Sequence, residues 1–201
     1  ALTEALVERR NHALIFGPRG SGKTSLARVF GDLCDEAGFV VVYLSSSGDQ
    51  SFQQLMRPYL DDLPADLFPG GRRPLLPDGF TARDFAGALA AIERRRIILV
   101  VDEFDRIVRP EVQHDIANLL KFLADMRAGA NLLLVGIARN VDDLLGGHPS
   151  LRRHVAAVAI GAVEDTAILA LIEDGARRSG VAFEAEAQRL ATSVALGSPY
   201  H

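Results

Sequence analysis

Residues 17–25, GPRGSGKTS, have the spacing of a loop that wraps around phosphate groups. Glycines in such a loop allow backbone N–H groups to turn toward a β-phosphate, because no Cβ stands in the way. Lys23 is placed to reach the β- and γ-phosphates, and the Thr24 hydroxyl is a ligand for Mg²⁺. We therefore predict a nucleotide site, whose cofactor-binding residues are Gly17, Pro18, Arg19, Gly20, Ser21, Gly22, Lys23, Thr24 and Ser25.

Two adjacent acids, Asp102 and Glu103, follow the apolar run 97–101. We predict that Asp102 holds Mg²⁺ through water and contributes to the cofactor site with Thr24. Glu103 is predicted to orient or deprotonate a water that attacks the γ-phosphate. Asp105 is interpreted as part of a solvated loop. An acid placed for water favours hydrolysis over transfer to a substrate hydroxyl, and the absence of an Asn-Lys-x-Asp guanine-reading motif favours ATP.

The phosphate loop and the two acids must be positioned by strands, and the pattern of apolar residues along the chain predicts such strands. Short apolar runs, rich in β-branched residues, alternate with segments whose apolar residues recur at helical spacing. Strands that alternate with helices predict a parallel sheet covered on both faces, an α/β fold. The strands are expected at 12–16, 39–44, 97–102, 131–138 and 155–160, and the first three of them are expected to be buried. The helices are expected at 2–10, 23–38, 51–60, 81–94, 110–129, 164–179 and 184–196.

Composition limits the class of protein. The 201 residues suffice for one domain, or one with a small appendage. Hydrophobic residues are 48% and the net charge is −4, so the chain reads as soluble and globular, with no charge-based sign of nucleic-acid binding. The apolar runs are too short to span a bilayer, and the single cysteine, Cys34, is expected to be a buried thiol. We expect a cytoplasmic location and no membrane partner.

One long segment has no assignment. Residues 61–80 hold four prolines and three glycines, and so long a loop is uncommon in a compact domain. Two interpretations stay open: a functional loop and a tolerated surface insertion.

Four segments together resemble AAA+ ATPases, and specifically the origin-recognition and initiator-like branch with related bacterial ATPases and signalling NTPases. They are GPRGSGKTSLA, IILVVDEFDRI, NLLLVGIARNVDDLL and HPSLRRHVAAVAI. The resemblance implies a five-stranded P-loop core with strand order 5-1-4-3-2 over residues 1–161. It also implies that residues 162–201 begin a helical lid, which we expect to be cut from a longer chain.

The resemblance also implies further site residues. Either Arg139 or Asn140 is at the position that senses the γ-phosphate, and Asn140 has the usual chemistry. Arg152 and Arg153 lie where the family carries an arginine that completes a neighbouring subunit's site. His154 and Tyr200 stand where arginines are common in the family, which favours slow turnover.

Three functions remain open. The first is an Mg²⁺-dependent ATPase whose nucleotide state controls assembly or partner contact, with ATP and ADP as ligands and a homo-oligomer joined by the trans arginine. The second is a signalling-type switch with little turnover, and the third is a small-molecule phosphotransferase. DNA or protein partners are expected to bind through regions outside these residues.

Overall fold

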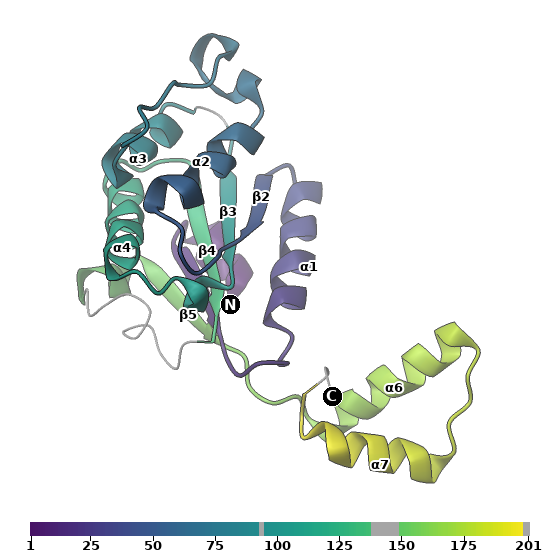
Figure 1. Ribbon diagram of the computed structural model, residues 1–201. Helices are drawn as coiled ribbons and strands as arrows, with labels where there is room; N and C mark the ends of the chain where they lie inside the picture. The colour runs from purple at the N-terminus through teal and green to yellow at the C-terminus, as the bar shows by residue number, and fades with distance from the viewer. Residues whose placement is uncertain (93–94, 138–148, 199–201) are drawn as a thin grey trace.

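A parallel five-stranded sheet is the frame on which every other element is placed. The computed structural model describes residues 1–92, 95–137 and 149–198 (Figure 1). The strand order is β2-β3-β4-β1-β5, so the predicted α/β fold and the order 5-1-4-3-2 are confirmed. The strands are β1 (His12–Phe16), β2 (Val40–Ser45), β3 (Ile97–Asp102), β4 (Ala130–Gly136) and β5 (Val155–Ala159).

Helices cover both faces of this sheet, as a parallel sheet requires. Figure 1 shows α1 on one face and α2, α3 and α4 on the other. The α-helices are α1 (Lys23–Glu36), α2 (Phe52–Asp62), α3 (Ala82–Ala90), α4 (Pro110–Asp125), α6 (Asp165–Ser179) and α7 (Ala185–Ala195). The short turns are η1 (Thr3–Glu8), η2 (Ala65–Leu67), η3 (Pro69–Gly71), η4 (Phe104–Arg106) and η5 (Pro149–Arg153).

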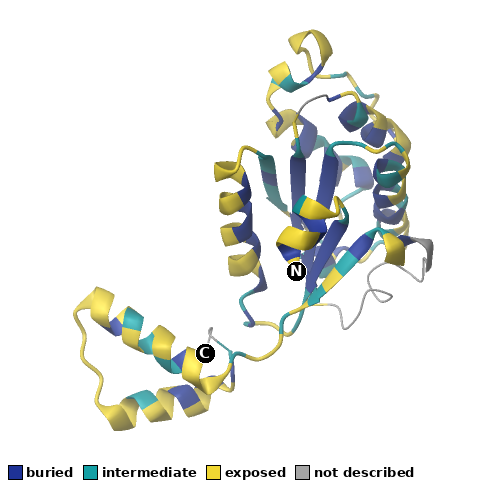
Figure 2. Ribbon diagram, turned by 180° about the vertical axis from the view of Figure 1, so that it is seen from behind, coloured by how far each residue is buried: buried dark blue, intermediate teal, exposed yellow. Residues whose placement is uncertain are grey.

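The two faces carry separate apolar cores, because side chains alternate along each strand. Leu99 and Val101 face the larger core, which includes residues of α2, α3 and α4. Ile98 and Val100 face the smaller core, which includes residues of α1 and η1. The three central strands, β3, β4 and β1, are buried along almost their whole length (Figure 2).

The prediction that residues 39–44 form a buried strand is wrong in one respect. Within β2 only Val42 is buried, and its neighbours are half-exposed. The reason is topological, since β2 is an edge strand and pairs with β3 alone. A continuous apolar run therefore did not distinguish an edge strand from a central one.

Local signals set the helix starts. The Thr81 hydroxyl accepts a hydrogen bond from Asp84 N, and the Asp84 carboxylate accepts one from Thr81 N, which confirms the predicted capping box. The helix ends at Ala90, before the predicted end near residue 94, and residues 93–94 lie outside the described chain.

The helix at the start of the chain is shorter than predicted. The prediction covered residues 2–10, and the structure has a six-residue π-helix at Thr3–Glu8.

The unassigned segment 61–80 is attached to the larger core. Phe68 and Phe80 are buried within it, and the Phe80 ring stacks on Phe85 with centroids 6.0 Å apart. Phe52 packs edge-on against both Phe80 and Phe85. Between these anchors most residues are exposed, and Leu75 is fully so, but Leu76 is partly buried against the core. The segment therefore contributes separate apolar side chains to the core.

The last two helices form a hairpin that extends away from the sheet (Figure 1). Figure 2 shows that most of its surface is exposed, and only Ile168, Ala176, Thr192 and Ala195 are buried in the two helices. The hairpin closes at its base, where Val163 N donates to Gly197 O at 2.7 Å.

The single cysteine lies where the sequence predicts. Cys34 is buried on α1 and unpaired. No helix among the described residues is long and apolar enough to cross a bilayer.

Replacing Phe80 with Ala is expected to lower the free energy of unfolding by about 3–5 kcal/mol, because a fully buried ring leaves a cavity among Phe52 and Phe85. Urea denaturation measures the loss. The control is Leu75→Ala in the same segment, which should change stability by less than about 0.5 kcal/mol. Equal effects of the two substitutions would show that the segment is not anchored to the core.

Candidate functional site

Three strands end at one edge of the sheet, and two of them, β1 and β3, end at or directly before a residue of the predicted site. Gly17 follows β1, Asp102 is the last residue of β3, and Gly136 is the last residue of β4. Ligands of open α/β sheets bind at this carboxyl edge. A cavity of about 280 Å³ opens there, lined by Arg19, Gly20, Lys23, Thr24, Asp102, Glu103, Asp105, Arg106, Val135, Gly136 and Ile137.

The loop between β1 and α1 has the backbone that its glycines permit. Gly20 and Gly22 have φ of +76° and +84°, in the left-handed region that side chains disfavour. Gly22 caps α1 without any side-chain hydrogen bond, so the first N–H groups of the helix keep their capacity to bind an anion. Gly17 packs against the backbone after β5, where a Cβ would lie 2.1 Å from Ile160 O.

Lys23 is the first residue of α1, directly after this loop, and only 8% of its surface is exposed. Its Nζ donates a hydrogen bond to Pro18 O at 2.6 Å, and Ser21 Oγ donates to the same carbonyl at 2.9 Å. Burial lowers the pKa of Lys23, while the carboxylates of Asp105 and Asp102 act in the opposite direction. The ammonium group is therefore held over the loop and next to two acids.

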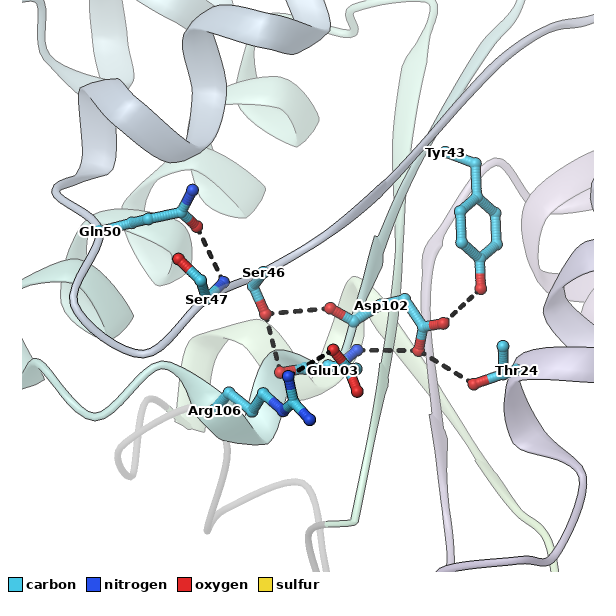
Figure 3. A network of polar contacts seen from close by, with 8 residues as sticks. All are labelled: Thr24, Tyr43, Ser46, Ser47, Gln50, Asp102, Glu103 and Arg106. Atoms are coloured by element: carbon cyan, nitrogen blue, oxygen red, sulfur yellow. Dashed lines mark hydrogen bonds and ion pairs between the residues drawn. The ribbon is translucent and has the colours of Figure 1, made fainter.

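Asp102 is the hub of the site, 3% exposed and surrounded by donors from three elements (Figure 3). Its Oδ2 accepts from the Tyr43 hydroxyl of β2 at 2.5 Å. Its Oδ1 accepts from Glu103 N at 2.8 Å and from Thr24 Oγ1 of α1 at 3.4 Å. Burial and the hydrogen bond to Asp102 raise the pKa of Tyr43, so its phenol keeps the proton that it donates.

The oxygen atoms of Thr24 and Asp102 fit Mg²⁺. This ion is usually bound through one or two protein oxygens, with phosphate and water completing its shell. The hydroxyl and the carboxylate lie within hydrogen-bond distance of each other beside Lys23. The described residues contain no cluster of three or more His, Cys, Asp or Glu side chains suited to a metal. A site of the Mg²⁺–phosphate kind needs no such cluster, since the nucleotide itself supplies ligands.

Glu103 stands in an uncommon backbone conformation for a residue with a side chain, with φ of +55°. The Ser46 hydroxyl is shared between the carbonyl oxygens of Asp102 and Glu103, at 2.9 and 2.7 Å. The Glu103 carboxylate forms an ion pair with Arg106 at 3.0 Å (Figure 3). Strain of this kind is concentrated at functional positions.

The interpretation of Asp105 as a mere loop residue is wrong. Its Oδ1 accepts a hydrogen bond from Ile137 N at 3.0 Å, which ties η4 to the end of β4. Gly136 allows this approach, because a Cβ there would lie 3.0 Å from the same oxygen.

The remaining predicted residues are not gathered in this cavity. Arg152 and Arg153 end η5, just before β5, and are exposed at the amino edge of the sheet. The five residues of β5 separate them from the loop by about 16 Å. Arg139, Asn140 and Tyr200 lie outside the described residues.

Sequence reasoning missed four residues that the structure places at the site: Tyr43, Ser46, Arg106 and Ser198. Ser198 Oγ donates to Gly20 O at 3.1 Å, so the end of the hairpin contacts the phosphate loop. Tyr43 and Ser46 flank the end of β2, where the sheet order alone brings them beside β3. The resemblance predicted the sheet order, yet no motif marked these positions.

Comparison with known proteins agrees with this geometry. The chain belongs to the AAA domain family, whose model matches residues 7–145. No curated protein matches the chain.

Solved structures of replication initiators share the fold. Cdc6p from Pyrobaculum aerophilum is 20% identical with a TM-score of 0.64, over 96% of this chain and 52% of that one. The ADP form of the Aeropyrum pernix ORC2 protein is 18% identical with a TM-score of 0.59, over 87% and 52%. AMPPCP-bound DnaA from Aquifex aeolicus is 18% identical with a TM-score of 0.56, over 92% and 49%. The chain thus spans about half the length of these proteins.

Replacing Gly17 with Ala is expected to lower the free energy of unfolding by about 1–3 kcal/mol, because the new Cβ meets a backbone carbonyl that cannot move aside cheaply. Gly161→Ala is the control, since nothing lies within 4 Å of a Cβ there. Urea denaturation compares the two. An unchanged midpoint for Gly17→Ala would contradict the close packing of the loop on the end of β5.

Proposed function

We propose that this chain is an AAA+ module that binds and hydrolyses ATP in the presence of Mg²⁺, with the nucleotide state controlling assembly or partner contact. One observation carries the proposal. Thr24, Asp102 and Glu103 converge beside Lys23 in a cavity at the carboxyl edge of the sheet. Family membership supports nucleotide binding at this place.

Binding uses the loop and the start of α1. The backbone N–H groups of residues 19–24, at the amino end of α1, hold the phosphates, and the helix dipole favours their negative charge. When phosphates enter, Lys23 exchanges its bond to Pro18 O for phosphate oxygens. This exchange replaces a neutral acceptor with a charged one, which forms a stronger hydrogen bond.

Thr24 and Asp102 would hold Mg²⁺ through their side-chain oxygens. The ion, when bound, neutralises charge on the β- and γ-phosphates. Tyr43 fixes the Asp102 carboxylate from the other side, so the group is oriented before the ion arrives.

Glu103 orients and deprotonates the water that attacks the γ-phosphate. For this step its carboxylate leaves Arg106, and the pair is partly exposed, so little free energy opposes the separation. The Ser46 hydroxyl keeps the Glu103 backbone in place during that change.

The same ion pair favours the alternative of a switch with little turnover. If Arg106 keeps Glu103 engaged, the site binds nucleotide and does not activate water. Sustained Mg²⁺-dependent phosphate release separates the two functions. A phosphotransferase is less favoured. It needs a pocket for the acceptor, and segment 61–80, which had no assignment from the sequence, supplies none of the residues that line the cavity.

We propose the division into a core, residues 1–161, and the start of a helical lid, residues 162–201. The bond from Ser198 to Gly20 supports it, since it joins the hairpin to the nucleotide loop. Known structures of similar fold include an ORC1 protein in complex with DNA and DnaA bound to single-stranded DNA. For this chain we propose a cytoplasmic location, and DNA or protein partners that bind through regions outside these residues.

Replacing Glu103 with Gln should leave ATP affinity near that of the unaltered protein and lower the rate of phosphate release by about 100-fold or more, since the general base is removed. Equilibrium binding of a fluorescent ATP analogue and steady-state phosphate release measure the two quantities. Glu111→Gln, an exposed acid on α4 that pairs with Arg109, is the matched control and should change neither. Turnover of the E103Q protein at the normal rate would eliminate Glu103 as the base.

We expect Arg152 and Arg153 to act on the site of a neighbouring copy, because they lie too far from their own loop. The double variant R152A/R153A should bind ATP and hydrolyse it slowly. Adding the equally inactive E103Q protein should then restore phosphate release, since mixed assemblies contain sites with an intact base and intact arginines. If the mixture stays as slow as its components, while both proteins still associate, the trans role is wrong.

A further inference from the structure

The opposite edge of the sheet holds a second cavity, of about 540 Å³, which the proposed ATPase does not use. Three of the connections that enter strands supply its arginines: Arg10 precedes β1, Arg95 and Arg96 precede β3, and Arg127 precedes β4. The buried side chains of Ile92 and Leu123 add an apolar wall. The cavity therefore combines four cations with an apolar surface.

These positive charges are not neutralised within the described chain. None of the four arginines forms an ion pair with a carboxylate of residues 1–92, 95–137 or 149–198. Burial and the nearby charge of Arg10 lower the pKa of Arg96. The cluster is thus self-repelling, and an anion placed among the guanidinium groups would relieve that repulsion.

Contacts that stabilise the fold account for only some of these four arginines. Arg96 Nη2 donates to Leu6 O at 2.8 Å and its guanidinium lies over the Phe39 ring, so it secures η1. Arg95 makes one long hydrogen bond, 3.4 Å to Gly38 O. The guanidinium groups of Arg10 and Arg127 form no hydrogen bond with any residue that the structure describes.

Helix dipoles do not account for these arginines either. The stabilisation of a helix by a cation at its carboxyl end is strongest within the last turn and falls off beyond it. The last turns of α3 and α4 contain no basic residue, and Arg95 and Arg127 lie beyond the ends of these helices.

Backbone strain singles out two of the four. Arg10 and Arg127 have φ of +55° and +50°, in the left-handed region. Arg127 directly follows Met126, the C-cap residue of α4. Glycine is the usual residue at the position after a C-cap, because it has no Cβ and adopts the left-handed conformation without penalty. Strained residues of this kind cluster at ligand sites.

The floor of the cavity is polar, neutral and fixed. His12 is buried there, with Nε2 donating to Leu120 O at 2.9 Å and Nδ1 accepting from Leu132 N at 3.0 Å. Burial lowers the pKa of His12 to about 4, so the ring is neutral near pH 7. Asn131 is tied to Arg10 O. The charge that faces a ligand therefore comes from the arginines on the rim.

We propose that this cavity binds a small anion that carries at least two phosphate groups. The planar fork of each guanidinium matches phosphate oxygens in pairs. The volume is that of a small-molecule site. A concave site in a chain of net charge −4 favours a compact anion over a long nucleic acid, whose binding needs an extended basic surface.

The test uses protein saturated with a fluorescent ADP analogue, so that the phosphate loop is occupied, and sodium tripolyphosphate as the probe, in buffer without Mg²⁺. Calorimetric titration measures binding of tripolyphosphate, and the fluorescence reports any displacement of the nucleotide. The variants are Arg95→Gln and Arg127→Gln, whose side chains have no major structural contact. Arg72→Gln is the matched control, because it removes one charge from the exposed segment 61–80.

We expect one saturable tripolyphosphate site with unchanged nucleotide fluorescence. Each cavity variant should weaken it about 10-fold, the loss of one charge-assisted contact, and Arg72→Gln should not. Binding that displaces the nucleotide, or that falls equally in all three variants, would overturn the proposal. Tighter binding of a single-stranded oligonucleotide through the same two arginines would overturn it in favour of a nucleic-acid surface.

Discussion

The proposed nucleotide site is organised around one carboxylate, that of Asp102, which is almost completely buried. Burying such a group is costly unless hydrogen bonds replace its water. Here the replacements come from α1, from β2 and from the next residue, so three elements are joined at one oxygen pair. The helix that carries Lys23, the edge strand and the turn of Glu103 are consequently placed relative to each other by the same group.

The sequence predicted the fold and located the candidate site, but it did not reveal the residues that support that site. Phosphate loops and strand-end acids are local patterns, so residues 17–25 and the pair 102–103 were recognisable without a structure. The strand order followed from the resemblance and is confirmed. The roles proposed for the site residues stay predictions. Tyr43 and Asp105 could not be found in this way, because their partners lie 59 and 32 residues away and depend on which strands are neighbours. The edge position of β2 was hidden for the same reason.

The two edges of the sheet differ in the charges of their side chains. At the carboxyl edge acids and bases are interleaved, with Lys23 beside Asp102 and Asp105, and Glu103 beside Arg106. At the amino edge the cavity lining contains arginines and no described acid. His154, which lines that cavity, directly follows the two arginines proposed to act in trans. A ligand at the amino edge would therefore lie close to the proposed boundary between subunits.

The left-handed backbone of Glu103 places this residue under opposing selective demands. A residue with a side chain is disfavoured at φ of +55°, and glycine or asparagine would hold the same turn at lower free energy. Screening of this chain for thermal tolerance alone would thus reward replacements of the proposed base. Directed evolution for higher thermal stability should therefore be combined with a selection for turnover, because a substitution that relieves the backbone strain at Glu103 also removes the carboxylate of the proposed base.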